Sequence, residues 1–187
     1  MGDNYSVDVL MEEHRNILQL TKVMKSMAIF LMEDRKVHPL DLREIIEFIR
    51  NYSDEHHHGK EEKILFQMMV DEIGGPAEKL VRNGMIVEHE LARMYVMDLE
   101  ESLERLEKNH CPENRLEVIG HLMEYANLLQ KHAEKEDTVV YPFALRSLSR
   151  EILEQADEET KAFEKAHGHR RDKFLKKLQD LEEKYCQ

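Results

Sequence analysis

Three prolines at nearly equal intervals divide this sequence and limit the folds open to it. Pro39, Pro76 and Pro112 each stand where a helix can begin, because a first-turn residue needs no amide donor and the residue before a proline avoids the α conformation. The prolines therefore predict four long helices, with Ser6 or Asp8 as the N-cap of the first. The expected helices span residues 7–34, 39–73, 76–109 and 113–141.

The composition supports an all-α fold. The 187 residues include only seven glycines and four prolines, while strong helix formers dominate the sequence. Short connections between long helices favour antiparallel neighbours. We therefore predict an up-down-up-down antiparallel four-helix bundle over residues 1–145. Residues 146–187 are predicted to form a C-terminal extension of one or two helices that pack on the bundle, and Pro142 is expected to kink or end the fourth helix.

Charge and hydropathy argue against several classes of partner. The formal net charge is −12, which repels nucleic acid and anionic lipid, and the basic residues form no stripe. No apolar run is long enough for a membrane span, and the first thirty residues contain no apolar core typical of a signal peptide. We expect a cytoplasmic protein that binds neither nucleic acid nor membrane. Cys111 and Cys186 show no paired spacing, which predicts two free thiols.

Polar residues occupy positions where the helical period calls for apolar ones. Each predicted helix carries a histidine on its inward stripe, and the second and fourth helices also carry a glutamate one turn later. A single inward histidine would be typical of a hydrogen-bonded core residue. The joint pattern instead predicts a metal-binding set: His14, His57, Glu61, His89, His132 and Glu136.

The spacing of these residues indicates an internal repeat. His14 precedes His89, and His57 precedes His132, by the same 75 residues. The surrounding sequence motifs also match, since Glu-His recurs on the first and third helices and His-x-x-x-Glu on the second and fourth. Two similar helical hairpins related by a pseudo-twofold axis would bring all six side chains together.

The residue types favour a metal centre with nitrogen and oxygen ligands. Burying two carboxylates without a counter-charge would cost several kcal/mol each, and a cation removes that cost. Imidazole and carboxylate ligands without thiolate suit iron, manganese or zinc. Two bridging carboxylates, Glu61 and Glu136, favour two metal ions over one.

The sequence resembles the hemerythrin-like HHE cation-binding domain family across residues 7–145. The segments that show the resemblance are, in order, EEHRNIL, HHHGKEEKILF, IVEHELAR and KHAEKEDTVVYP. It implies a four-helix bundle with a non-haem centre of two iron ions, in which Glu61 and Glu136 act as bridges. The implied small-molecule ligand is dioxygen, nitric oxide or peroxide, and zinc or manganese could substitute for iron.

One feature departs from the oxygen-carrying members of that family. Those proteins have two histidines four residues apart on the third helix, whereas Met85 and Arg93 flank His89 at that distance. The missing donor predicts a more open centre, which favours sensing or redox chemistry over reversible transport. Asp137 competes with Glu136 for the bridging role, and the helical wheel favours Glu136.

Other residues near this set remain alternatives. His58 shares a face with polar residues, so we predict that His58 and Glu62 are solvated, with the alternative that they are the ligands. His56 is expected behind the ligands or at the surface. The donors that could complete the coordination sphere are His38, Tyr125 and His167.

Two classes of function follow, together with a structural alternative. The favoured one is a di-iron protein that binds, senses or reacts with a small oxidant, with enzymatic activity left open. The second is an iron-responsive regulatory module whose C-terminal helices bind an unknown protein partner. The third is a structural metal-binding bundle.

Overall fold

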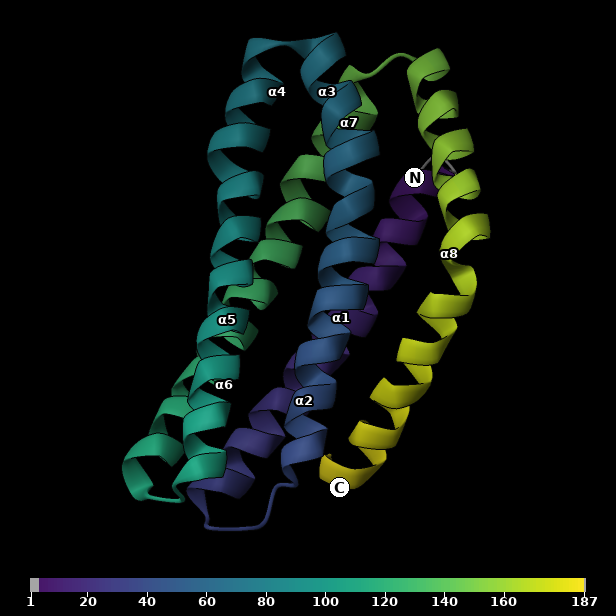
Figure 1. Cartoon of the computed structure of the whole chain (residues 1–187). Helices are drawn as coiled ribbons and strands as arrows, with labels where there is room; N and C mark the ends of the chain where they lie inside the picture. Colours follow the sequence, from purple (N-terminus) through teal and green to yellow (C-terminus); the bar gives the residue numbers. More distant parts are fainter. Residues whose placement is uncertain (1–3, 187) are drawn as a thin grey trace.

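The computed structural model describes residues 4–186, and these form five long helical rods (Figure 1). Helix α1 (Tyr5–Met32) is the first rod, and α8 (Arg150–Tyr185) is the last. The three rods between them each join two α-helices through π-helical turns. The second rod consists of α2 (Pro39–Phe48), the π-helical turns Ile49–His58 and Glu61–Leu65, and α3 (Phe66–Ile73). The third consists of α4 (Gly75–Leu80), the π-helical turn Val81–Met85 and α5 (Ile86–Lys108). The fourth consists of α6 (Pro112–Lys135), the π-helical turn Glu136–Val140 and α7 (Tyr141–Ser147).

The first four rods run alternately up and down, which confirms the predicted all-α bundle. Pro39, Pro76 and Pro112 each lie in the first turn of a helix, as predicted. Gly74 ends α3 with a φ of 72°, a backbone conformation that glycine adopts without the steric cost of a side chain. The two cysteines are free thiols, as predicted.

One local prediction about a helix end is wrong, and of the two alternatives for Pro142 the structure excludes that it ends the helix. The N-cap of α1 is Asn4, whose side chain accepts a hydrogen bond from the Val7 amide, and both Ser6 and Asp8 lie inside the helix. Pro142 does not end the fourth rod, which continues to Ser147. The π-helical turn at Glu136–Val140 directly precedes this proline, and such turns alter the hydrogen-bond ladder in which a proline cannot donate.

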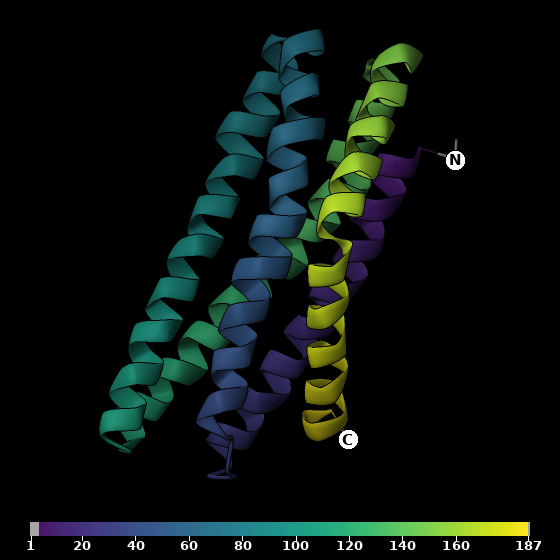
Figure 2. The same ribbon diagram turned by 45° about the vertical axis from the view of Figure 1, so that its right-hand side comes forward.

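Helix α8 is a single helix that packs along α1 and α2 (Figures 1 and 2). Phe174, Leu178, Leu181 and Tyr185 join the apolar core of the bundle. No helix among residues 4–186 has the length and apolar character needed to cross a membrane.

The buried apolar residues form two separate clusters. The larger one includes Ile17, Phe48 and Leu99 and reaches the end of the bundle where α1 meets α2. The smaller one includes Leu10 and Phe66 and lies towards the α3–α4 connection. The sequence positions between the clusters are occupied on every rod of the bundle by buried polar residues, so a polar layer crosses the interior of the bundle.

Candidate metal centre

Seven side chains from all four rods of the bundle converge in this polar layer. They form two groups whose ligand-type atoms all lie within 4.8 Å of one another. One group is His58, Glu61, His89 and His132, and the other is His14, His57, Glu61 and Glu136. All seven residues are buried, and Glu61 belongs to both groups. The structure therefore brings together all six predicted residues and adds His58.

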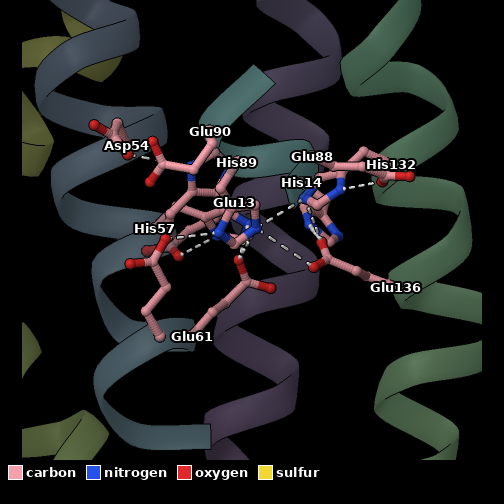
Figure 3. Close-up of polar contacts among 12 residues, drawn as sticks. Glu13, His14, Asp54, His57, Glu61, Glu88, His89, Glu90, His132 and Glu136 are labelled. Carbon is pink, nitrogen blue, oxygen red and sulfur yellow. Dashed lines mark hydrogen bonds and ion pairs between the residues drawn. The ribbon is translucent and has the colours of Figure 1, made fainter. Parts of the chain in front are cut away.

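The two glutamates lie between imidazoles of different rods, as Figure 3 shows for the labelled residues. Glu136 Oε2 is 3.1 Å from His14 Nε2 and 3.2 Å from His132 Nε2. Glu61 Oε2 is 3.6 Å from His57 Nε2 and 3.5 Å from His89 Nε2. Each carboxylate thus faces nitrogen atoms on both sides, which is the arrangement that a bridging ligand requires.

His58 is buried, so the prediction that it is solvated is wrong. Its relative exposure is 1%, and its ring stacks on that of His89. The prediction assumed a regular α-helix, but residues Ile49–His58 are π-helical. A π-helical turn holds an extra residue and changes which side chains face inward. Glu62 is partly exposed and lies behind His89.

Every histidine in the two groups has a carboxylate behind it. The Nδ1 atoms of His14, His57, His58, His89 and His132 contact Asp137, Glu13, Asp54, Glu62 and Glu88 respectively, at 2.7 to 3.3 Å. A carboxylate on Nδ1 fixes the ring orientation and leaves Nε2 free for a metal ion. The structure thus holds five imidazoles in the orientation typical of metal ligands.

Sequence reasoning did not find these supporting carboxylates, although a signal was present. Four of them are neighbours in sequence of a predicted ligand, but each supports a histidine on another rod. Glu13 and Glu88 are equivalent positions of the 75-residue repeat, and their contacts are equivalent too: Glu13 contacts His57 and Glu88 contacts His132. Glu62 and Asp137 likewise support His89 and His14. The 75-residue repeat therefore extends to the contacts behind the ligands.

Within the two ligand groups, the pKa shifts show where protons balance the buried charges. Burial would lower the pKa of His14, but hydrogen bonds with Asp137 and Glu136 raise it to about 10. Burial lowers the pKa of His57 to about 4 despite its contact with Glu13. Burial and the nearby Glu136 raise the pKa of Glu61 well above its usual value. A cation that displaced these protons would neutralise both carboxylates.

The atoms without partners provide a direct test of whether metal ions fit. Four buried ligand-type atoms in the two groups form no hydrogen bond: His57 Nε2, His58 Nε2, Glu61 Oε2 and Glu136 Oε1. Buried polar atoms are normally paired, and an unpaired one costs about 1–3 kcal/mol. Nitrogen and oxygen donors are the ligands that iron, manganese and zinc accept. The residues present therefore fit bound metal ions.

Tyr141 is a further buried residue that sequence reasoning missed. Its hydroxyl donates a hydrogen bond of 2.6 Å to Glu61 Oε1 and lies 3.5 Å from His14 Nε2. Burial and the charge of Glu61 raise the pKa of Tyr141, so the phenol stays neutral. Tyr141 therefore orients Glu61 from the side of His14.

The remaining candidates lie outside both groups. His38 caps α2 by accepting a hydrogen bond from the Leu40 amide, and His167 packs against Phe163 on α8. Tyr125 is buried and lines a neighbouring cavity. Met85 belongs to the smaller apolar cluster. The fifth buried imidazole of the two groups is therefore that of His58 on the second rod.

The fold and the site define a helical-bundle protein whose interior is arranged to bind cations. The family model described as the hemerythrin HHE cation-binding domain matches residues 5–144. The chain belongs to this family, and the predicted resemblance is confirmed. No match was found among curated proteins or among solved structures.

Proposed function

We propose that this protein holds two iron ions bridged by carboxylates and uses them to bind, sense or react with a small oxidant. The observation that carries the proposal is the set of buried, unpaired nitrogen and oxygen atoms from His57, His58, Glu61 and Glu136. Two iron ions would satisfy these atoms and would supply exchangeable electrons and positions for a ligand.

The two groups of ligands differ, which supports a division of roles. The group with His58 contains three imidazoles, and the group with His14 contains two. Each group contains four residues, but if Glu61 and Glu136 are shared by both ions, the ion on the side of His14 has fewer protein donors, which leaves a position for another ligand. We therefore propose that dioxygen, nitric oxide or peroxide binds on the side of His14 and His57, where Tyr141 presents its hydroxyl.

A cavity next to the centre offers a route from solvent. It has a volume of about 260 Å³ and lies between the second rod and α5. Ile49, Ala92 and Val96 form apolar walls, and His58 lies among the lining residues. Apolar walls suit the passage of small, weakly solvated molecules. This cavity reaches the side of His58, so a slower reaction in Ala92→Phe at unchanged metal content would show that the oxidant enters there, and an unchanged rate would support entry on the side of His14.

The decisive experiment is metal analysis of protein purified without oxygen from iron-replete cells, followed by optical spectra. We expect about two iron atoms per chain and a spectral change on adding dioxygen, nitric oxide or peroxide. Reproducible binding of one zinc ion and no iron would overturn the proposal. Two iron ions with no response to any oxidant would leave a structural or regulatory metal site.

Removing the oxidant again separates two modes of action. A return to the reduced spectrum without added reductant, over several cycles, identifies reversible binding. Permanent oxidation identifies a reaction. The position of His58 beside His89 supports a fifth imidazole ligand, so the lack of a second histidine on the third rod does not favour reaction over reversible binding.

A further inference from the structure

A buried lysine joins α8 to the rods that carry the metal site. The side chain of Lys60 is 1% exposed, and its ammonium donates hydrogen bonds to Glu13 and Glu164. Glu164 lies on α8, outside the region that matches the family. A lysine is rarely buried so completely unless carboxylates compensate its charge. The bundle therefore depends on a residue of α8 to neutralise a charge in its interior.

Lys60 occupies a place that would otherwise suit a metal ion. Glu13, His56 and Glu164 form a third group of ligand-type atoms, and His56 Nε2 lies 3.0 Å from an oxygen of each glutamate. Lys60 contacts all three residues, with Nζ 3.3 Å from His56 Nε2. The lysine thus supplies the positive charge here, and the group is a structural link with no need of a third metal.

This link leads directly to a metal-site histidine. Glu13 uses one oxygen to accept from Lys60 and the other to contact His57 Nδ1 at 3.0 Å. At the other end, Arg171 donates to Glu164 at 2.7 Å. Burial would raise the pKa of Glu164, but hydrogen bonds with His56 and Lys60 lower it to about 2. A continuous line of charged contacts therefore runs from α8 to His57.

The repeat provides an internal comparison. Lys135 and Glu88 are the equivalents of Lys60 and Glu13, and Glu88 supports His132 in the same way. The side chain of Lys135, however, is 41% exposed, and no carboxylate of α8 contacts it in the described part of the chain. Helix α8 thus supports only one of the two equivalent halves.

We propose that Glu164 and Lys60 are positioning residues for His57, so that metal binding in the group of His14 and His57 is coupled to the docking of α8. The inference rests on the proposed metal centre. Such coupling is reciprocal: if docked α8 strengthens metal binding, bound metal stabilises docked α8 by the same factor. The stability of docked α8 would then depend on whether metal is bound at the centre.

The first test compares two substitutions on α8 that remove the same charge. Glu164→Gln removes the negative charge at the α8 end of the link but keeps one acceptor oxygen. Glu182→Gln is the matched control, since Glu182 contacts Gln19 on α1 away from the centre. Ferrous ion is titrated anaerobically against a chelator, with circular dichroism to verify folding. We expect Glu164→Gln to weaken one of two bound ions about tenfold or more, and Glu182→Gln to match the wild type. Wild-type affinity for both ions in Glu164→Gln would overturn the inference.

The second test places the effect in one half of the centre. Glu164→Gln is combined with His14→Ala and, separately, with His89→Ala. If Glu164 acts on the group of His14, it should cause little further loss of affinity in the His14→Ala background and its full loss in the His89→Ala background. The opposite pattern would contradict the assignment.

The third test measures α8 itself by amide hydrogen exchange, with and without ferrous ion. We expect the metal to slow exchange in residues 160–171 about tenfold in the wild type and to have little effect in Glu164→Gln. Exchange in α8 that ignores the metal would overturn the coupling even if two ions bind. Failure of the wild type to bind any ferrous ion would instead refute the proposed function.

Discussion

The imidazole rings of His58 and His89 lie stacked, with centroids 3.8 Å apart and planes inclined by 9°, although the residues come from different rods of the bundle. Each ring is held from behind by a carboxylate, Asp54 for His58 and Glu62 for His89. Arg93 then joins these two carboxylates, with a nitrogen 2.7 Å from an oxygen of each. The stacked pair is therefore fixed as a unit, which makes His58 as firmly placed as the histidines found from the sequence pattern.

Replacing His58 with Ala should remove at least one metal ion per chain. The reason is that His58 Nε2 is buried, unpaired and within one of the two ligand groups. Metal content of the purified variant is the measurement. His121→Ala is the control, because His121 is partly exposed and contacts Glu124 away from the centre. Equal metal content in the two variants would show that His58 is not a ligand.

Metal-free protein should lose stability as the pH rises from 6.5 to 10. Burial opposes protonation of both His14 and His89. Hydrogen bonds with Asp137 and Glu136 nevertheless raise the pKa of His14 to about 10. Hydrogen bonds with Glu136 and Glu62 raise the pKa of His89 to about 10. A raised histidine pKa gives stability that is complete below the unfolded value near 6.5 and is lost as the pH passes the folded value. Urea unfolding at a series of pH values measures this. Constant stability across the range would contradict the pKa directions.

Tyr141→Phe should lower the free energy of unfolding of the metal-free protein by about 1–3 kcal/mol, because it leaves a buried oxygen of Glu61 without its donor. Tyr5→Phe is the control, since Tyr5 is 37% exposed and its ring contact with Lys161 can be kept by Phe. Denaturant unfolding of both variants gives the comparison. Equal stability would mean that the hydrogen bond to Glu61 contributes nothing.

Two glycine substitutions should act in opposite directions. Gly74→Ala forces a side chain into a positive φ of 72° and should cost about 1–2 kcal/mol. Gly120→Ala fills open space within helix α6 and should stabilise by about 0.5–1 kcal/mol. Thermal unfolding measures both. A Gly74→Ala variant as stable as the wild type would show that the backbone relaxes at this connection.

The helix boundaries were predictable because proline acts locally. Pro39, Pro76 and Pro112 restrict their own dihedral angles whatever lies around them, and each begins a helix in the structure. Pro142 also lies in the first turn of an α-helix, α7, but the π-helical turn Glu136–Val140 joins α7 directly to α6, so the fourth rod continues to Ser147. The local rule therefore holds at helix starts but does not tell whether the preceding helix ends there.

Six of the seven clustered residues were predictable because they interrupt apolar stripes on four helices with one shared spacing. His58 was missed because a helical wheel assumes a constant angle per residue, and the π-helical turns around His57 and Glu61 change that angle. The contact of Glu164 with Lys60 could not be predicted from the sequence for another reason. It depends on how α8 packs against the bundle, and nothing in the local sequence specifies that packing.

The polar layer between the two apolar clusters also determines how the helices align lengthwise. Apolar stripes alone would allow neighbouring rods to slide by one turn, about 5.4 Å, and still bury similar surfaces. Such a slide would separate His14 from Glu136 and Glu13 from Lys60, leaving buried charges without partners. The polar layer thus makes the observed lengthwise alignment of the helices far more favourable than an alignment shifted by one turn, before any cation is bound.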